Sequence, residues 1–361
     1  SIVAQGAETK FNLLPGEYWW GGHSFMGSSM PYSAQEGFAD TLIDDNACNQ
    51  TVGLMLSSKG RWLWNNEPFA FQFTNGIFTA KDNGKGEFKT GCAEEKTLRG
   101  AFLEASKRFF PADGKMPDEL LFTAPQWNTW VELTYNQNQR DILAYAQDIL
   151  KNGFKPGVLM VDDTWQHSYG VWDFNYKRFP DPKAMCAQLH KMGFKLMLWV
   201  CPYVGLDTWE VRQELTSKDA CGCLQDEKGD PAVFRWWNGR SACVDFTSPL
   251  GVKWFSSKLD FLQREYGVDG FKFDGGSYTM YKSTNIQNGE PREDHDTAAL
   301  NIAWNEFGAA YTYHAVTIGL GELLACARMI IRCDVLEEPV GEIILCGLTE
   351  QEQRQRSHLP K

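Results

Sequence analysis

Residues 266–276 read Tyr-Gly-Val-Asp-Gly-Phe-Lys-Phe-Asp-Gly-Gly, a short apolar strand that ends in a carboxylate and two glycines. Alternation along a strand places Lys272 and Asp274 on one side and Phe271 and Phe273 on the other. An ionised carboxylate at the end of an apolar strand is costly unless it is partnered or functional. The residues alone leave two interpretations of Asp274 open: a cap or ion partner of Lys272, or a functional group that faces the lumen of a barrel.

A repeating order of strand and helix surrounds this segment and extends over residues 119–314. The strands are continuously apolar, which is typical of parallel strands covered by helices on both faces. The pattern predicts about the first half of a (β/α)8-type barrel, in which the active site lies at the carboxyl ends of the strands. The expected strands are Leu120–Ala124, Gly157–Asp162, Phe194–Val200 and Asp269–Asp274, and the expected helices cover 139–151, 182–192, 251–266 and 296–313.

Residues 1–118 have a different, β-like pattern. Apolar and polar residues alternate in the segment 69–74, and Asn75-Gly76 before the next apolar run is a strong hairpin signal. Residues 82–86 form a second turn signal, and one helix is expected at about Glu94–Phe109. We therefore predict an N-terminal β-sandwich domain before the barrel, so that the fold class is α/β plus β.

The last region, residues 315–361, continues neither pattern. Aromatic residues make up 14% of the whole chain, yet the last one is Tyr313. We expect an atypical C-terminal tail here. The sequence leaves open whether the tail is a native variant or a foreign or frame-shifted end.

The composition excludes several classes of protein. The chain has 361 residues and a net charge of −11, so it lacks the clustered cations that binding to nucleic acid or to anionic lipid requires. No apolar run approaches the roughly 18 residues of a membrane span, and ten cysteines are too sparse for a disulfide scaffold. Because the chain opens at Ser1, we expect either an arbitrary boundary or a mature terminus after signal-peptide removal, hence a periplasmic, cell-surface or secreted protein.

A second polar cluster follows the expected strand at 157–162. Asp162 and Asp163 are adjacent carboxylates that could hold sugar hydroxyls through charge-assisted hydrogen bonds. With His167 they could instead bind a divalent metal, but this set fits neither a zinc triad nor a carboxylate cage closely. A single loop histidine is more often a polar surface residue, so we predict no metal site.

Two adjacent tryptophans, Trp236 and Trp237, lie in a segment rich in glycine, asparagine and arginine. Exposed indole rings could form a wall on which a sugar ring stacks. The alternative is a loop that plugs the top of the barrel with apolar side chains, because large aromatic residues are usually buried. Residues 247–249, Thr-Ser-Pro, come next and are typical of a helix start.

Four motifs occur in order along the chain. They are Asp162-Asp163-Thr-Trp165, the segment 172–182 (Trp-Asp-Phe-Asn-Tyr-Lys-Arg-Phe-Pro-Asp-Pro), the segment 193–199 (Gly-Phe-Lys-Leu-Met-Leu-Trp) and Phe271-Lys-Phe-Asp274-Gly-Gly. In this order they resemble glycoside hydrolase family 31, in the branch of the myogenesis-regulating glycosidase and its bacterial relatives. The resemblance covers about residues 1–314.

The resemblance implies a β-sandwich, a (β/α)8 barrel, C-terminal β-domains, and retaining hydrolysis of an α-glycoside or oligosaccharide without a cofactor. It implies that Asp274 is the catalytic nucleophile and that Asp162 binds a hydroxyl of the sugar whose bond is cleaved. Tyr18–Gly22 matches an N-domain segment that reaches toward the pocket. Six further positions match residues that line the substrate pocket: Asp163, Trp165, Trp199, Trp236, Trp237 and Lys272.

The chain departs from the family pattern in two places. Retention needs a second carboxyl group as acid and base, which the family takes from an Asp after the sixth strand, but the pattern here is lost near Ala315. Asp334 has a plausible spacing without matching neighbours, so the acid stays unassigned. Ser277 stands where this branch often has Glu, which bears on sugar specificity.

Three functions are compatible with these residues. We predict the first, a retaining α-glycoside hydrolase acting on α-linked sugars of the α-glucoside or α-galactoside type. The second is a catalytically incomplete, carbohydrate-binding form of the same fold. The third is a metal-dependent barrel enzyme that uses Asp162, Asp163 and Asp274.

Overall fold

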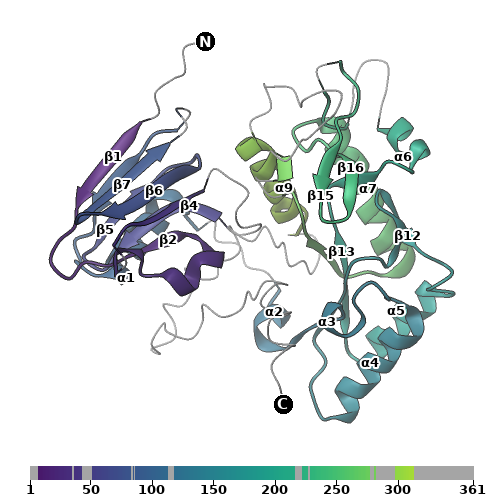
Figure 1. The fold of residues 1–361 in the computed structure, drawn as a ribbon. Coiled ribbons are helices and arrows are strands. Elements are labelled where there is room, and N and C mark those ends of the chain that lie inside the picture. The colour runs from purple at the N-terminus through teal and green to yellow at the C-terminus, as the bar shows by residue number, and fades with distance from the viewer. Residues whose placement is uncertain are drawn as a thin grey trace. The chain divides into compact units, whose positions relative to one another are not determined.

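The computed structural model describes residues 7–34, 36–42, 51–82, 84, 86–112, 118–215, 222–226, 228–276, 280–281 and 297–312. They separate into two compact units, one formed by the described residues up to 112 and the other by those from 118 onward (Figure 1). The predicted tail at 315–361, with Asp334, lies outside the described residues, and so does Ser277.

The first unit contains two four-stranded antiparallel sheets, with strand orders β1-β7-β6-β3 and β2-β4-β5-β8. Asn75 and Gly76 join β6 to β7 with φ angles of 53° and 69°, the left-handed pair that a two-residue hairpin turn favours. The predicted hairpin is therefore confirmed. The strands are β1 (Glu8–Asn12), β2 (Trp19–His23), β3 (Phe38–Thr41), β4 (Thr51–Ser57), β5 (Arg61–Trp64), β6 (Phe69–Thr74), β7 (Ile77–Asp82) and β8 (Lys89–Cys92).

Side chains from both sheets of the first unit share one buried cluster. Trp19 and Met55 come from one sheet, and Phe71, Phe73 and Phe78 come from the other. The alternation of apolar and polar residues along β6 produces this packing, because every second side chain points to the same face. Two short 3-10 helices, η1 (Ser24–Ser29) and η2 (Tyr32–Ala34), follow β2.

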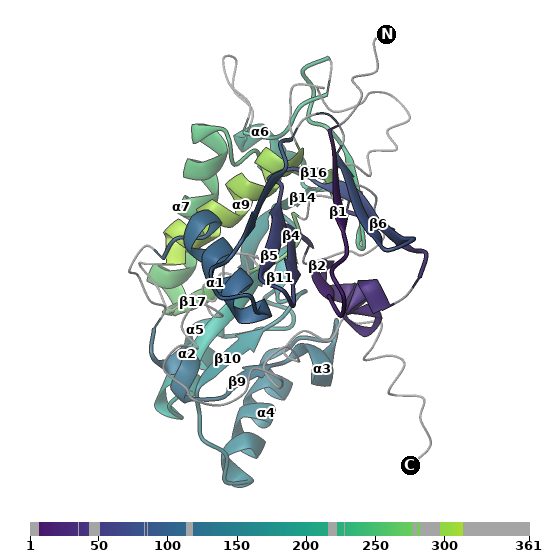
Figure 2. The same ribbon diagram turned by 90° about the vertical axis from the view of Figure 1, so that its left-hand side faces the viewer.

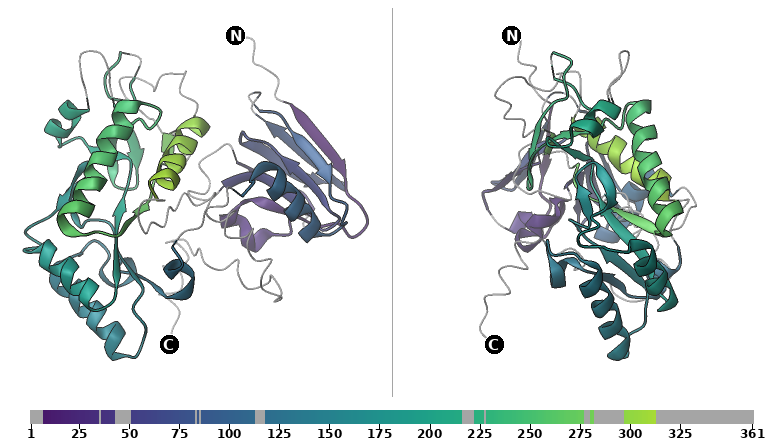
Figure 3. Two further views of the ribbon diagram at one scale, coloured as in Figure 1. Left: turned by 180° about the vertical axis from the view of Figure 1, so that it is seen from behind. Right: turned by 90° about the vertical axis from the view of Figure 1, so that its right-hand side faces the viewer.

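The second unit is built on a four-stranded parallel sheet with the order β17-β13-β10-β9. Helix α5 packs against β13 and α9 against β17, and Figure 2 and Figure 3 show α4, α5 and α7 in succession beside the strands. The strands are β9 (Gln126–Asn128), β10 (Val158–Val161), β13 (Lys195–Val200) and β17 (Gly270–Phe273), and these helices are α4 (Gln139–Lys151), α5 (Pro182–Lys191), α7 (Pro249–Tyr266) and α9 (Thr297–Thr312).

The first predicted strand, Leu120–Ala124, is wrong. These residues form a short helix, α2 (Leu120–Thr123), whose start is favoured by a hydrogen bond from Leu120 N to Asp118 Oδ1. Ala124 is extended, with φ −132° and ψ 156°, as expected of a residue before proline. The strand therefore begins only after Pro125, and Gln126 and Trp127 lie in it rather than beyond its end.

Helix starts in both units follow capping side chains. In α4 the Asn138 side chain accepts a hydrogen bond from Asp141 N, as the predicted start at 139 requires. Helix α1 (Leu98–Phe109) begins later than the predicted Glu94, because the Thr97 hydroxyl accepts from Gly100 N and fixes the start there. The remaining short helices are α3 (Trp130–Leu133) and α6 (Trp209–Glu214).

Two small antiparallel sheets follow the carboxyl ends of β10 and β13. After β10 comes a pair, β11 (Gln166–Ser168) and β12 (Val171–Phe174). After β13 comes a three-stranded sheet with the order β14-β16-β15. Its strands are β14 (Tyr203–Gly205), β15 (Phe234–Trp236) and β16 (Gly239–Cys243).

None of the helices within the described ranges combines the length and apolar character that crossing a lipid bilayer requires. The described cysteines are free thiols: Cys92, Cys186, Cys201, Cys223 and Cys243.

Candidate active site at the carboxyl ends of the parallel strands

The parallel sheet brings four of the predicted site residues to one edge. Asp162 follows β10, Trp199 lies near the end of β13, and Lys272 and Asp274 lie at the end of β17. Since β13 neighbours both other strands and Trp199 is in register with Lys272, these side chains gather where the strands end. This edge is where parallel α/β folds place their active sites.

The Asp274 carboxylate is fixed by groups on both of its oxygens. Trp199 Nε1 donates to Oδ2 over 2.7 Å, and Gly275 N donates to Oδ1 over 2.7 Å. The backbone of Asp274 is held as well, because its N–H donates to Val200 O. The side chain is 24% exposed, so the carboxylate is both oriented and within reach of solvent or ligand.

Lys272 lies between two carboxylates. Its Nζ is 3.1 Å from Asp162 Oδ2 and 3.7 Å from Asp274 Oδ2. One cation thus serves two acids in a site with little water, since the Asp162 side chain is only 4% exposed. Lys272 and Asp274 lie on the same side of the strand, as alternation predicts. Asp274 is therefore an ion partner of Lys272 and also lies at the carboxyl end of the strand.

Asp163 faces away from this pair. Its carboxylate accepts hydrogen bonds from Tyr169 OH at 2.9 Å, from Asn238 Nδ2 at 3.0 Å and from Gln166 Nε2 at 3.2 Å. All three donors are neutral. Burial, strengthened by the nearby charge of Asp162, outweighs them and raises the pKa of Asp163 to about 6.

The four predicted tryptophans occupy different environments. Trp165 lies in the core with no exposed surface, and its Nε1 donates to Trp199 O over 2.7 Å. Trp236 is also buried, with its Nε1 donating to Ser241 Oγ and its ring centroid 4.4 Å from that of Tyr203. Trp199 is buried, and its Nε1 donates to Asp274.

Trp237 is the exposed member of the tryptophan pair, with 47% of its surface accessible. One edge of its ring is close to Gly275, because a Cβ added to that glycine would lie 3.7 Å from Trp237 Cη2. The paired tryptophans are not in an irregular loop: Trp236 ends β15 and Trp237 stands at the tip of the β15–β16 hairpin. One ring packs inward and the other borders the residue next to Asp274.

The metal interpretation gains no geometric support among the described residues. Within those ranges no three His, Cys, Asp or Glu side chains are grouped as metal ligands. His167 is exposed, and its Nδ1 lies 3.2 Å from Ser168 Oγ. The Lys272 ammonium already occupies the position between Asp162 and Asp274.

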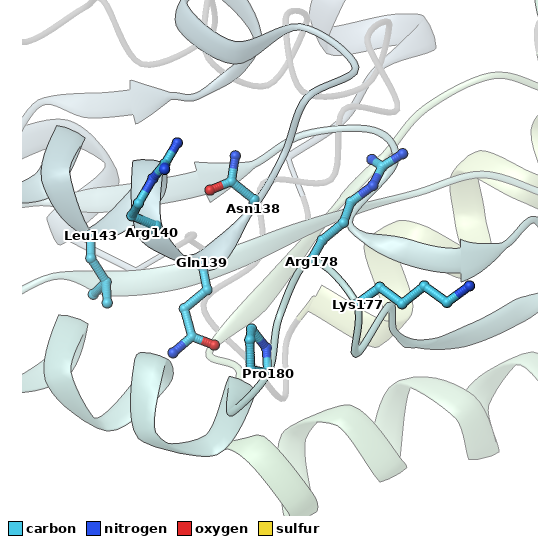
Figure 4. Close-up of a pocket in the computed structure, with 7 residues that line it drawn as sticks. All are labelled: Asn138, Gln139, Arg140, Leu143, Lys177, Arg178 and Pro180. Carbon is cyan, nitrogen blue, oxygen red and sulfur yellow. The ribbon is translucent and has the colours of Figure 1, made fainter.

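A separate depression of about 500 Å³ lies between the start of α4 and the segment after β12. It contains none of the predicted site residues, and Figure 4 shows that the charged ends of Arg140, Lys177 and Arg178 do not converge on one point. It is lined by Asn138, Gln139, Arg140, Leu143, Lys177, Arg178 and Pro180.

Comparison with known protein families decides what this architecture is. Residues 122–322, more than half of the chain, match the model of the glycosyl hydrolases family 31 TIM-barrel domain. The chain belongs to glycoside hydrolase family 31. The resemblance drawn from the four ordered motifs is therefore confirmed, and the parallel strands with their helices lie in the TIM-barrel domain of the family.

Relatives of this family 31 chain include proteins named as glycosidases. The mouse myogenesis-regulating glycosidase is 34% identical over 174 residues, which are 47% of this chain and 24% of the relative. An α-xylosidase, XylQ, from Lactiplantibacillus pentosus is 24% identical over 245 residues, 62% of this chain and 31% of that protein. The chain thus spans about a quarter to a third of the length of these relatives.

Solved structures share the fold. A family 31 dextranase from Flavobacterium johnsoniae, complexed with glucose, superposes with a TM-score of 0.68 at 16% identity and covers 88% of this chain and 41% of its own. An α-xylosidase from a soil metagenome, complexed with xylose, gives a TM-score of 0.59 at 19% identity, covering 86% of this chain and 44% of the xylosidase.

Sequence reasoning did not single out two residues next to the candidate site, Tyr169 and Asn238. Both contact Asp163, and Asn238 stands at the hairpin tip beside Trp237. The dipeptide Asn238-Gly239 is a hairpin signal that could have indicated the tip, and Gly239 has the positive φ of 97° that such turns use. Nothing in the local sequence marks Tyr169. Tyr18–Gly22 belongs to the other unit.

Proposed function

We propose that this chain carries the nucleophile of a retaining α-glycoside hydrolase that acts on α-linked sugars of the α-glucoside or α-galactoside type. The observation that carries the proposal is the Asp274 carboxylate, which is held by Trp199 Nε1 and Gly275 N at the carboxyl end of a barrel strand. A nucleophile must be oriented before it meets the anomeric carbon, and this one is oriented through both oxygens.

In this mechanism an Asp274 oxygen attacks the anomeric carbon while the bond to the leaving oxygen breaks. A second carboxyl group about 5–5.5 Å away protonates that oxygen and later deprotonates the water that releases the sugar. Lys272, beside Asp274, offsets the negative charge of the free site. The family resemblance implies that the second carboxyl group comes from an Asp after the sixth barrel strand, and we leave this residue unassigned.

We assign substrate contacts to the groups that border Asp274. Asp162 and Lys272 form a polar pair suited to sugar hydroxyls, because charge-assisted hydrogen bonds to hydroxyls are strong. Trp237 offers the exposed indole on which a sugar ring can stack. Trp199 orients the nucleophile. The buried Trp165 supports Trp199, and the buried Trp236 packs against Trp237 in the hairpin.

The finer fold assignment belongs to the same proposal. We take the two sheets of the first unit as an N-terminal β-sandwich, supported by the buried cluster that both sheets share. We take β9, β10, β13 and β17 as the first four strands of an eight-stranded barrel, supported by their sequential parallel order.

Hydrolysis of aryl α-glycosides with gluco, xylo and galacto configurations tests the function. We expect turnover of at least one of them, and a loss of at least about a thousandfold in Asp274→Ala, as removal of a covalent nucleophile demands. Asp269→Asn, at the other end of the same strand, is the matched control and should keep turnover. Activity of Asp274→Ala within tenfold of the parent would contradict the assignment. A parent chain that binds sugar without cleaving it would instead favour the carbohydrate-binding form.

A further inference from the structure

The tip of the β15–β16 hairpin is tied to the segment that follows β10. Asn238 Nδ2 donates to Asp163 Oδ2 over 3.0 Å and to Tyr169 OH over 2.5 Å. On its other side Asn238 Oδ1 accepts from Tyr135 OH at 3.3 Å. A side chain at the turn of an antiparallel hairpin usually faces solvent, whereas this one makes three contacts with another part of the unit.

Tyr169 is the centre of the tie. Its hydroxyl donates to Asp163, and its ring meets Trp236 edge-on with centroids 4.8 Å apart and Trp199 with centroids 6.2 Å apart. Tyr169 therefore contacts the Asp163 carboxylate, Trp236 of the hairpin and Trp199, which donates to Asp274. Burial and the charge of Asp163 raise the pKa of Tyr169, so the hydroxyl remains a donor.

A strained turn directly follows the two adjacent aspartates, which have different partners. Thr164 has a φ of 75°, a left-handed conformation that is rare for a β-branched residue. It is held there because Thr164 Oγ1 donates to Tyr135 O over 2.8 Å and Arg178 Nη1 donates to Thr164 O over 3.1 Å. Before this turn Asp162 meets Lys272, and Asp163 turns toward the hairpin.

We infer that Asp163, Tyr169 and Asn238 form an anchor that holds the hairpin tip, and with it Trp237, beside Gly275 and Asp274. Tyr169 and Asn238 are then positioning residues for the apolar wall against which a sugar ring packs, and Asp163 acts through them rather than on the substrate. This inference rests on the proposed glycosidase function. Its structural part, the tethering of the hairpin, does not depend on turnover.

Gly275 shows why the tip must be held. Gly275 has a φ of 71°. A Cβ added to it would lie 3.1 Å from Tyr203 Cε2 and 3.7 Å from Trp237 Cη2, so the glycine is packed between the two rings. Side chains of the small sheet thus border the residue that follows Asp274. A loose hairpin would displace Trp237 while leaving the Asp274 hydrogen bonds intact.

Amide hydrogen exchange in the segment 234–243 of the full chain tests the tether without any substrate. In Asn238→Ala and in Tyr169→Phe we expect exchange there to rise about tenfold, the factor that corresponds to loss of one hydrogen bond to a charged group. Tyr311→Phe, which removes a hydroxyl that donates to Asp260 on α7, is the matched control and should leave the segment unchanged. If Tyr169→Phe unfolds the chain, Asn238→Ala carries the test. Unchanged exchange would overturn the anchor.

Steady-state kinetics of Asn238→Ala on an aryl α-glycoside tests the positioning role. We expect KM to rise about tenfold with kcat within threefold of the parent, and Trp237→Ala to reproduce that pattern, because both remove a binding surface and spare the nucleophile. A fall in kcat at unchanged KM would overturn the positioning role. If the parent turns over no α-glycoside, the proposed function is wrong. If amide exchange in 234–243 is unchanged in the variants, the anchor is wrong, so the two failures are distinguishable.

Discussion

The two ends of strand β17 each carry an aspartate, and their surroundings differ. At the amino end Asp269 is bonded to His190 Nε2 at 2.6 Å, to Lys195 Nζ at 2.9 Å and to Leu196 N at 2.8 Å. At the carboxyl end Asp274 accepts two hydrogen bonds, and its nearest described cation, Lys272, lies 3.7 Å away.

Under the proposed function, the difference separates a structural carboxylate from a reactive one. Asp269 joins α5, β13 and β17, and two basic side chains satisfy its charge. Asp274 shares one ammonium with Asp162 and keeps part of its surface open, so a substrate can reach it. In (β/α) barrels the amino-terminal face serves stability and the carboxyl-terminal face serves chemistry, as the proposed function assigns to the two ends of this strand.

The largest difference between the two ends should appear when the lysine next to each aspartate is replaced. Lys272→Met leaves Asp162 with an unpaired buried charge, so we expect a loss of about 3–5 kcal/mol in the free energy of unfolding and at least about a thousandfold in kcat/KM. Lys195→Met removes an ion pair whose lysine is 48% exposed, and should cost at most about 1 kcal/mol with kcat/KM unchanged. Urea unfolding and steady-state kinetics measure both. Equal effects at the two ends would refute the division of roles.

The pH dependence of stability should isolate Asp163. Its pKa is raised to about 6 in the folded chain, so the folded state keeps a proton that the unfolded chain releases near pH 4. Stability should therefore fall as pH rises from about 4 to about 6, by on the order of 2–3 kcal/mol. Asp163→Asn cannot titrate and should lack this decline. The free energies of unfolding of the parent and of Asp163→Asn are measured in urea. A difference between them that stays constant from pH 4 to pH 7 would contradict the assignment.

A modest effect on stability alone should come from Asp269→Asn. The change keeps the shape of the side chain and weakens charge-assisted bonds to His190 and Lys195, so we expect a loss of about 1–2 kcal/mol in the free energy of unfolding. Turnover should stay within threefold of the parent. Thermal unfolding and kinetics on the same preparation give both values. A variant with unchanged stability but lost activity would reverse the comparison.

Local patterns were enough to predict most of the barrel segment. The continuous apolar runs gave β10, β13 and β17 within a residue or two, and the caps at Asn138 and Asp181 agree with the predicted helix starts. Strand alternation placed Lys272 and Asp274 together. The first strand was misplaced because Asp118 starts a helical turn and Pro125 delays the strand, two short-range effects that the apolar run at 120–124 masks.

The contacts that sequence reasoning did not predict depend on distant partners. Asp163 matches a pocket-lining position of the family pattern, and its carboxylate accepts a hydrogen bond from Asn238, 75 residues away. Trp165 matches a pocket-lining position of the family pattern but packs into the core beneath Trp199. Spacing along one strand is set by the backbone, whereas contacts between separate hairpins are set by packing that no local motif encodes.

Covalent labelling of Asp274 tests the central claim most directly. Incubation of the full chain with a mechanism-based α-glycoside inactivator, followed by intact mass and peptide mapping, should show one sugar ester on the peptide that contains Asp274. The label should be absent from Asp274→Ala and present in Asp269→Asn. An unlabelled parent chain, or a label on another residue, would contradict the assignment of Asp274 as the nucleophile.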